Sequence, residues 1–225
     1  MTNAIINVAT GRHIKGQNRL AKSLRGMNCR FYGYNAESDI GAPQHERQPY
    51  AFKTHAFRKA FSVHRHINVL WVDASVYAIK DVQPIFDHIE KHGYIMQEAG
   101  HMCGRWTNDK ALEYFGVTRD EAMTMSMYGN AGFLGLSIKS PKAMDFFNRW
   151  HQASTGGLFR GAWTNEKGGE SPDPRCDGHR HDMSCGSVIA NQLQMDYQSG
   201  NEWLAYASPS DPVNESIILK AQGIC

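Results

Sequence analysis

Short apolar runs divide the chain at fairly regular intervals, and each is bounded by Gly, Asn, Asp or charged residues. This pattern predicts strands at positions 5–9, 31–34, 69–72, 94–96, 130–136, 203–206 and 217–219. The run Val69–Val72 contains no polar residue, which is typical of a strand buried on both faces of a sheet. It ends at Asp73, so a carboxylate is expected at the carboxyl end of a central strand.

Between these runs, apolar residues recur three or four positions apart, which predicts helices. We expect helices around Leu20–Leu24, Phe52–Phe61, Pro84–Ile89, Pro141–Trp150 and Cys185–Leu193, and a short one at Thr118–Glu121, whose end residues form a capping-box pattern. In the segment Phe52–Phe61 the aromatic and alanine positions form the buried stripe, and the spacing leaves Lys53, Arg58 and Lys59 outside it.

Strands that alternate with helices predict an α/β fold: one Rossmann-like domain over residues 1–225, with a mainly parallel central sheet flanked by helices. Ligands of such sheets bind beyond the carboxyl ends of the strands. The stretch 154–181 is rich in Gly, Asp, Arg and Pro and shows no periodicity. It is longer than the ~12–15 residues at which structureless loops become uncommon, so we expect a mobile loop that acts as a lid or a binding segment.

Composition and charge narrow the choice of function. With 41% hydrophobic and 20% charged residues, the chain can bury a sizeable core, which excludes a disordered protein. A net charge of +2 lacks the basic footprint of nucleic-acid binders, so we expect no nucleic-acid partner. The first residues resemble neither a signal peptide nor a membrane span, so we expect a cytoplasmic protein with its five cysteines as thiols.

The end of the central strand carries the first candidate chemistry. Asp73 and Ser75 are two residues apart, so their side chains point the same way if the chain stays extended, and together they can hold one ion. An Asp at this point is equally common as a turn or cap residue. The segment from Leu70 to Val82 around them resembles the metal-site segment of GT-A fold glycosyltransferases, in which an apolar strand ends in an Asp-x-Asp motif; here Ser75 stands at the second acidic position.

Three further stretches resemble the same family, in the same order along the chain. Residues 5–11 resemble its first strand and nucleotide-contacting turn, and Tyr128–Gly135 resembles the Asn-x-Gly strand that lines the sugar pocket in family 8 enzymes. His181–Ser184 lies where related families place an Asp-Gln pair at the reaction centre, with Met183 at the Gln position. The resemblance extends from about Ile5 to Leu193 and implies a GT-A-like domain.

The resemblance also implies a site. Asp73, with Ser75 and a possible third ligand in His181, would hold Mn²⁺ or Mg²⁺, since hard cations prefer oxygen ligands. Asp182 would be the catalytic carboxylate, acting as base on the acceptor hydroxyl or stabilising the cationic sugar. The residues expected to bind the nucleotide-sugar donor are Thr10, Gly11, Arg12, Lys53, Asp73, Asn130, Gly132 and Lys220.

Each of these assignments has an alternative that the sequence leaves open. Asp182 can be only the N-cap of a helix. Lys220 can replace the metal at the diphosphate. The four residues Cys176, His179, His181 and Cys185 can form a zinc site, or the two histidines can be ordinary loop residues. The aromatic residues Trp106, Phe159 and Trp163 can stack on a sugar or nucleobase, or pin their loops to the core.

Together these observations predict a glycosyltransferase that moves a sugar from a nucleoside-diphosphate sugar, with a UDP-sugar as the first candidate, to the hydroxyl of a glycan or small-molecule acceptor with assistance from the metal. Two other functions remain open. One is a sugar-nucleotide-binding or zinc-stabilised module without turnover, suggested by Ser75 in place of an acid. The other is a nucleotidyltransferase, against which stands the lack of a Gly-rich, Lys-bearing loop after Val8.

Overall fold

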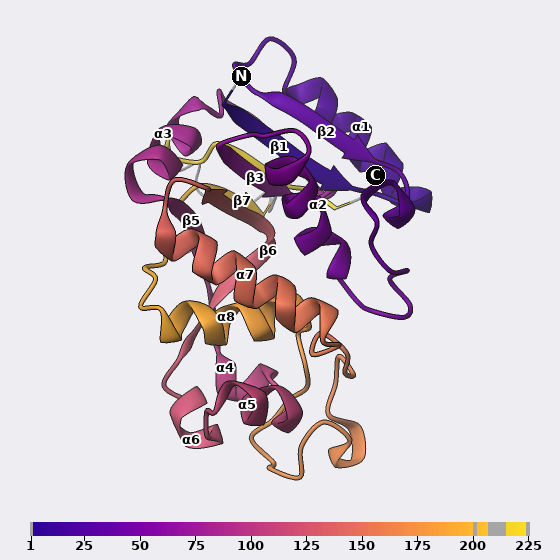
Figure 1. Ribbon diagram of the computed structural model, residues 1–225, viewed down its shortest axis with the longest axis vertical. Coiled ribbons are helices and arrows are strands. Elements are labelled where there is room, and N and C mark those ends of the chain that lie inside the picture. The colour runs from indigo at the N-terminus through magenta and orange to yellow at the C-terminus, as the bar shows by residue number, and fades with distance from the viewer. Residues whose placement is uncertain (1, 200–201, 207–214, 224–225) are drawn as a thin grey trace.

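A five-stranded sheet forms the centre of the molecule (Figure 1). The structure is a computed structural model and describes residues 2–199, 202–206 and 215–223. The strands lie in the order β2-β1-β3-β6-β5. Their bounds are β1 Asn3–Val8, β2 Arg30–Tyr34, β3 Asn68–Val72, β5 Tyr94–Met102 and β6 Ser126–Ser137. Every strand predicted in the range 5–136 is therefore present, and β5 and β6 are longer than their apolar runs indicated.

The sheet is mixed. Strand β1 pairs in parallel with β2 and β3, whereas β6 is antiparallel to both β3 and β5. Because β6 is inserted between β3 and β5, β5 runs in the same direction as the first three strands and β6 alone is reversed. The predicted α/β fold with flanking helices is confirmed, but the mainly parallel pairing is not, since an apolar run carries no information about strand direction.

Helices cover both faces of this sheet. The longer helices are α1 Ile14–Ser23, α2 Ala51–Ser62, α3 Gln83–His92, α7 Pro141–Thr155 and α8 Asp182–Gln192. Helices α2, α7 and α8 pack on the face to which Ile6 and Trp71 point, and α1 and α3 pack on the face of Ile5 and Leu70. Neighbouring residues of β1 and β3 thus enter opposite cores, as strand alternation requires.

Short helices and a long irregular segment form the lower part of the molecule in Figure 1. The helices are α4 Cys103–Trp106, α5 Asp109–Phe115 and α6 Arg119–Ala122. The predicted capping box of α6 is confirmed: Glu121 N donates to Thr118 Oγ1, and the Glu121 carboxylate accepts from Thr118 N. No helix in the described part of the chain is long and apolar enough to cross a bilayer.

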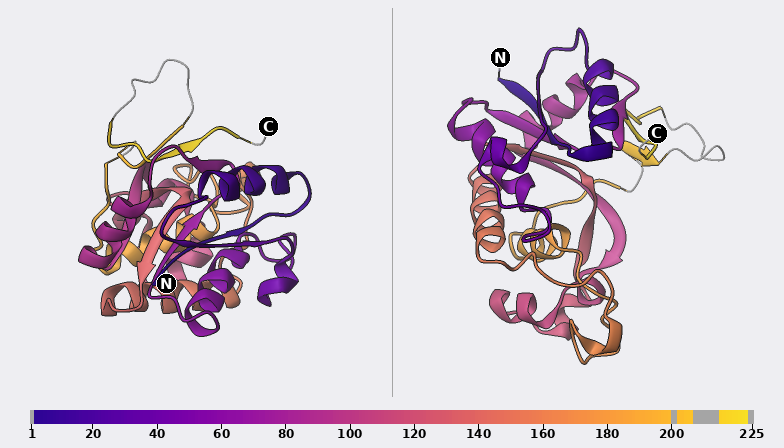
Figure 2. Two further views of the ribbon diagram at one scale, coloured as in Figure 1. Left: turned by 90° about the horizontal axis from the view of Figure 1, so that it is seen from above. Right: turned by 90° about the vertical axis from the view of Figure 1, so that its right-hand side faces the viewer.

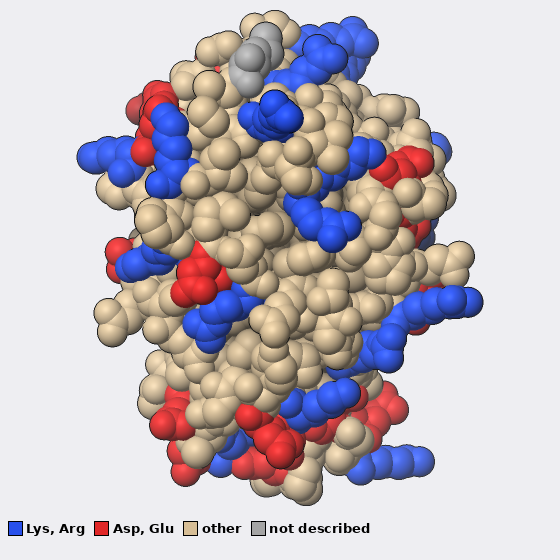
Figure 3. Space-filling view, viewed as in Figure 1, with Lys and Arg blue, Asp and Glu red and all other residues tan. Residues whose placement is uncertain are grey.

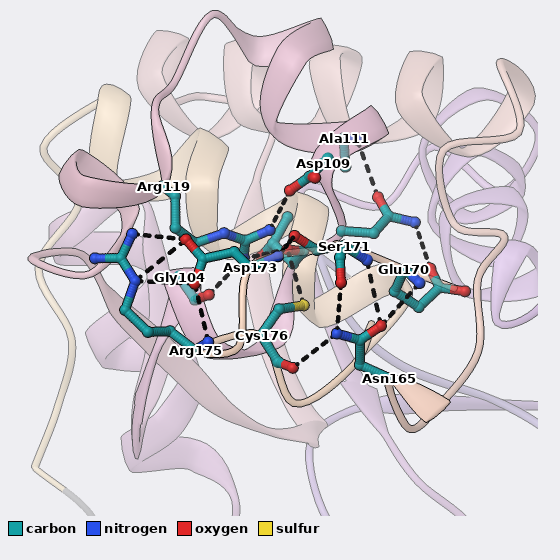
Figure 4. Close-up of polar contacts among 12 residues, drawn as sticks. Gly104, Asp109, Ala111, Arg119, Asn165, Glu170, Ser171, Asp173, Arg175 and Cys176 are labelled. Atoms are coloured by element: carbon teal, nitrogen blue, oxygen red, sulfur yellow. Dashed lines mark hydrogen bonds and ion pairs between the residues drawn. The ribbon is translucent and has the colours of Figure 1, made fainter. Parts of the chain in front are cut away.

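The predicted loop 154–181 begins inside α7 and contains one short 3-10 turn, η3 (Glu166–Gly168). The side chain of Asn165 organises it (Figure 4): Nδ2 donates to Ser171 O at 2.8 Å and to Cys176 O at 3.0 Å, and Oδ1 accepts from Glu170 N at 2.9 Å. Polar contacts within the segment thus replace regular structure. Its mobility without a ligand stays a prediction.

A second, three-stranded sheet joins the C-terminal strands to the segment that follows Asp73. It has the order β4-β8-β7, with bounds β4 Val76–Ala78, β7 Leu204–Tyr206 and β8 Leu219–Ala221. Figure 2 shows the C-terminal strands, in yellow, beside the N-terminal half of the chain. Strand β7 was predicted, but β8 begins at Leu219, where the predicted strand 217–219 ends, and neither β4 nor the separate sheet was predicted.

The turn after Asp73 is held by close packing against α1. A Cβ atom at Gly16 would lie 2.0 Å from Ala74 O, so only glycine allows this approach. Arg19, one turn further along α1, donates from Nη2 to Ser75 O at 2.8 Å. The backbone carbonyls of Ala74 and Ser75 are therefore both held by α1.

We predict that Gly16→Ala destabilises the fold by about 1–3 kcal/mol, because the added methyl group forces α1 away from the turn. Urea unfolding of the two proteins measures the difference. Gly169→Ala is the matched control: its Cβ would meet only Glu166 O, at 3.5 Å, and we expect a change within about 0.5 kcal/mol. Equal stability of the Gly16→Ala variant and the parent would contradict the packing argument.

Candidate active site

Two adjoining cavities lie around the end of β3. The larger has a volume of about 620 Å³ and the smaller about 320 Å³, and both are lined by Tyr50, Asp73 and Ser75. The larger is also lined by Lys53, Val76, Gln97, Glu98, Ala99, Gly100, His101, Gly132, Trp163, Arg180, Asp182, Met183, Leu204 and Ala221. The smaller is also lined by Val8, Ala9, Thr10, His13, Glu37, His45, Glu46, Phe52, Trp71 and Ala74.

A buried ion pair forms the floor of the larger cavity. Lys53 of α2 and Asp182, the first residue of α8, are each 2% exposed, and Lys53 Nζ lies 2.9 Å from Asp182 Oδ2. The expectation that Lys53 lies outside the buried stripe of its helix is therefore wrong. A lysine is buried here because a carboxylate 129 residues away in the sequence compensates its charge.

Asp73 lies beside this pair and faces both cavities. Its Oδ1 accepts from Trp71 Nε1 at 2.6 Å and lies 3.9 Å from Lys53 Nζ, and its backbone N donates to Gly132 O at 2.9 Å. The side chain is 36% exposed, in contrast to that of Asp182 at 3%. The two carboxylates thus share one ammonium group, and both line the larger cavity, but Asp73 is far more exposed to solvent than Asp182.

Burial and charge act in opposite directions on this cluster. Burial disfavours the ammonium form of Lys53, but Asp182 and Asp73 outweigh it, so the pKa of Lys53 is raised above its usual value. Burial raises the pKa of Asp182, and the charge and hydrogen bond of Lys53 oppose that rise. Asp182 is consequently a stronger base than an exposed aspartate.

Asp182 does not serve merely as a helix cap. The N-cap position of α8 belongs to His181, and the Asp182 carboxylate is directed to Lys53. The carbonyl oxygen of Asp182 accepts from Trp150 Nε1 at 3.0 Å, which holds the start of α8 against α7. The structure therefore places the predicted catalytic carboxylate in the wall of the larger cavity.

The predicted metal ligands are brought together only in part. Asp73 and Ser75 line both cavities, but His181 lines neither. His181 Nδ1 lies 2.8 Å from Phe159 O, and its ring packs 5.4 Å from the rings of Tyr50 and Trp163. Within the described ranges no three His, Cys, Asp or Glu side chains converge as metal ligands do. The protein offers one carboxylate and one hydroxyl, a set that fits a divalent ion only if a bound diphosphate supplies further oxygens.

The predicted donor-binding turn after β1 lies partly at the site. Thr10 lines the smaller cavity, and Gly11 follows it with φ +52°, a backbone conformation that favours glycine. Arg12 is exposed and lines neither cavity, whereas His13, which the sequence analysis did not select, does line the smaller one. The 3-10 turn η1 (Gly11–His13) accounts for this difference, because it turns the chain after Thr10.

Of the remaining donor-binding candidates, Gly132 lies at the site. It lines the larger cavity, and a Cβ there would come within 3.4 Å of the Asp73 side chain. The side chain of Asn130 lies outside what the structure describes. Lys220 lies in β8 and lines neither cavity, although its neighbour Ala221 lines the larger one. Side chains alternate along a strand, so Lys220 faces the other side of the small sheet.

The zinc interpretation of residues 176–185 is wrong. His179 Nε2 lies 3.0 Å from Leu158 O and its Nδ1 accepts from Asn108 N at 3.3 Å, so both ring nitrogens have protein partners. Burial lowers the pKa of His179 to about 3, which keeps the ring neutral. Cys185 Sγ lies against Leu158 O in the core. The cysteines 29, 103, 176 and 185 are free thiols, as predicted; Cys225 lies outside the described residues.

The aromatic candidates have structural roles. Phe159 is fully buried and packs 6.1 Å from Trp150. Trp106 and Trp163 each present a ring to Arg180, at 3.8 and 4.0 Å from its guanidinium carbon. They therefore hold a cavity-lining cation; Trp163 also lines the larger cavity itself, so its stacking on a ligand stays a prediction. Sequence reasoning missed Arg180 and Tyr50, since neither belongs to a motif with a chemical signature.

Comparison with known proteins identifies the fold. No protein-family model matches the chain, and no curated protein sequence does either. Among solved structures, apo mouse xyloside xylosyltransferase 1 superposes with a TM-score of 0.50 at 11% identity, covering 98% of this chain and 97% of that one. The apo structure of the WbbM bifunctional glycosyltransferase also gives 0.50 at 11% identity, over 91% of this chain and 40% of that one. The chain therefore has the fold of these glycosyltransferases.

We predict that Lys53→Met destabilises the protein by about 3–5 kcal/mol at neutral pH, because Asp182 is left buried without its partner. Without Lys53 the folded-state pKa of Asp182 rises further above its usual 3.8. Below about pH 3.8 the Asp182 carboxyl is protonated in both the folded and the unfolded protein. As the pH rises above this value, the unfolded protein releases the proton more readily than the folded one, so the free energy of unfolding of the variant falls. Urea unfolding should thus show a smaller deficit near pH 4 than at pH 8.

The double variant Lys53→Met with Asp182→Asn is the control for this pH dependence. It removes both charges, so we expect it to regain much of the lost stability at pH 8. A deficit that does not change with pH, or one that the second substitution does not relieve, would show that lost packing rather than the unpaired carboxylate causes it.

Proposed function

We propose that this protein is a glycosyltransferase that moves a sugar from a nucleoside-diphosphate sugar, a UDP-sugar in the first instance, to the hydroxyl group of a glycan or small-molecule acceptor. The observation that carries the proposal is the position of Asp73. It stands at the junction of the two cavities, beside a buried Lys53–Asp182 pair. The fold that the chain shares with glycosyltransferases supports it.

The two cavities suit the two parts of such a donor. The smaller combines apolar walls, from Val8, Phe52 and Trp71, with the polar groups of Thr10 and Glu37, which suits a base and a ribose. The larger has room for the sugar and the acceptor. A diphosphate that joins the two parts then lies at Asp73 and Ser75, where the cavities adjoin.

Cleavage of the donor separates charge in two directions. The sugar becomes oxocarbenium-like, as in glycoside hydrolysis, while negative charge grows on the diphosphate. A divalent ion held by Asp73, Ser75 and the donor would neutralise that negative charge. Asp182, with its raised pKa, takes the proton of the acceptor hydroxyl, and Lys53 fixes the orientation of its carboxylate.

The direct test is release of UDP from a panel of UDP-sugars, with and without sugar acceptors. Turnover that acceptors accelerate would support the proposal. Binding of UDP without any turnover would favour a sugar-nucleotide-binding module, and release of pyrophosphate from a nucleoside triphosphate would favour a nucleotidyltransferase.

We expect Asp182→Asn to lower turnover by about 100-fold or more, because the amide cannot accept the proton, while the KM for the donor changes little. Steady-state kinetics separate the two parameters. Asp145→Asn is the matched control, since Asp145 is an exposed residue of α7 that lines neither cavity. Turnover of the Asp182→Asn variant within about threefold of the parent would remove the base assignment.

A further prediction concerns the metal. Because the protein supplies only Asp73 and Ser75, calorimetry should show little binding of Mn²⁺ to the protein alone and clear binding once UDP is present, beyond the binding of Mn²⁺ to UDP itself. Asp73→Asn should remove this enhancement. Undiminished turnover after treatment with EDTA would remove the metal assignment.

A further inference from the structure

A guanidinium group is held flat in the wall of the larger cavity. Arg180 precedes α8 by two residues, and its guanidinium carbon lies 3.8 Å from the ring centroid of Trp106 and 4.0 Å from that of Trp163. The two indoles come from α4 and from the irregular segment before α8. Contacts this close are cation–π interactions, and two of them restrict the plane in which the guanidinium lies.

The backbone around Arg180 fixes this arrangement before any ligand binds. Arg180 N donates to Trp106 O at 3.1 Å and to Ser184 Oγ at 2.8 Å, and the Ser184 hydroxyl donates to the same Trp106 carbonyl. On the other side, Gly178 lies so close to Trp163 that a Cβ would come within 2.2 Å of its carbonyl oxygen. A ligand that binds Arg180 therefore does not have to order it.

Arg180 has no carboxylate in direct contact among the described residues, although Asp177 acts on its charge from a greater distance. Its neighbour Asp177 pairs with Arg105, whose Nε lies 2.6 Å from Asp177 Oδ2, and Asp182 pairs with Lys53. Among the residues that the structure describes, no carboxylate lies within ion-pair distance of Arg180. Burial lowers the pKa of Arg180, although the group stays charged. A partly desolvated cation of this kind gains from an incoming anion.

The Arg180 guanidinium donates no hydrogen bond to the described part of the chain, so its N–H groups are the part that a ligand in the cavity can use. These groups present donors in a fork that matches the two oxygens of a carboxylate or phosphate. Arg180 lines the larger cavity but not the smaller one, where Thr10 lies. It therefore stands on the side of the cleft that the proposed function gives to the sugar and the acceptor.

We propose that Arg180 is a specificity-determining residue that binds an oxyanion of the acceptor, so that the acceptor is an acidic sugar carrying a carboxylate or phosphate group. The identification of this ligand as the acceptor rests on the proposed function, but the binding of the oxyanion does not depend on turnover. The other oxyanion that a glycosyltransferase binds is the donor diphosphate, and the experiment separates the two sources.

The experiment compares the parent protein with Arg180→Lys and with Arg105→Lys. Lysine keeps the charge but loses the planar fork and its double stacking. Arg105 is the matched control, because it is a neighbouring arginine in an exposed ion pair and lines neither cavity. Calorimetry at a fixed salt concentration measures the affinity of each protein for four probes: methyl glucuronide, glucose 6-phosphate, the neutral methyl glucoside, and UDP.

We expect the parent to bind at least one acidic probe about tenfold or more tightly than methyl glucoside, and Arg180→Lys to reduce this preference to about threefold or less. Arg105→Lys should leave it unchanged, and UDP affinity should stay within about twofold in all three proteins. Circular dichroism and the melting temperature establish that each variant is folded.

Three results would overturn the inference. The first is a parent that binds neither acidic probe better than methyl glucoside. The second is an acidic preference that survives in Arg180→Lys. The third is a loss of UDP affinity in Arg180→Lys of tenfold or more, which would assign the oxyanion to the donor. A protein that binds no UDP but prefers acidic sugars through Arg180 would instead refute the proposed function alone.

Discussion

The arrangement of the site depends on one buried ion pair, that between Lys53 and Asp182. It joins α2 to the first turn of α8, two helices that pack on the same face of the sheet. Burying two charges costs several kcal/mol for each ion, which their mutual attraction offsets only in good geometry. The pair is therefore a poor source of stability but a strict constraint on position: α2 and α8 have to meet where the two side chains meet.

This constraint extends to the groups that a ligand can reach. Lys53 also lies 3.9 Å from Asp73, so the carboxylate at the end of β3 is held between an ammonium group and the Trp71 indole. The reversed strand β6 contributes Gly132, which lies against Asp73 without a side chain to cover it. The exposed carboxylate is thus ordered by groups that are themselves buried, the condition for a pre-organised site. On the molecular surface seen in Figure 3, basic and acidic side chains are interspersed, unlike the ordered cluster of charges at the site.

The elements were predictable from the sequence because they follow from local pattern. Apolar runs and helical spacing located the strands of the central sheet and its long helices. The end of an apolar strand drew attention to Asp73, whereas Asp182 was selected through the resemblance to glycosyltransferases. The direction of β6, the separate sheet of β4, β7 and β8 and the burial of Lys53 could not be predicted, since each depends on a partner far away in the chain. For the same reason four residues of metal-ligand type between 176 and 185 suggested a zinc site, although His179 and Cys185 bond to backbone oxygens instead.

If the protein binds a diphosphate as proposed, the charges of the site explain why one acidic residue after β3 would be enough. Asp73, Asp182 and Lys53 together carry one net negative charge, and a diphosphate brings more negative charge to the same place. A second carboxylate at position 75 would increase the repulsion, whereas the hydroxyl of Ser75 contributes an oxygen without charge. Under the proposed function, a cation bound together with the donor would neutralise this charge, since the ammonium of Lys53 is already paired with Asp182. Arg180 also lines the larger cavity and has no carboxylate at ion-pair distance among the described residues, so we infer that it is available to a second anion.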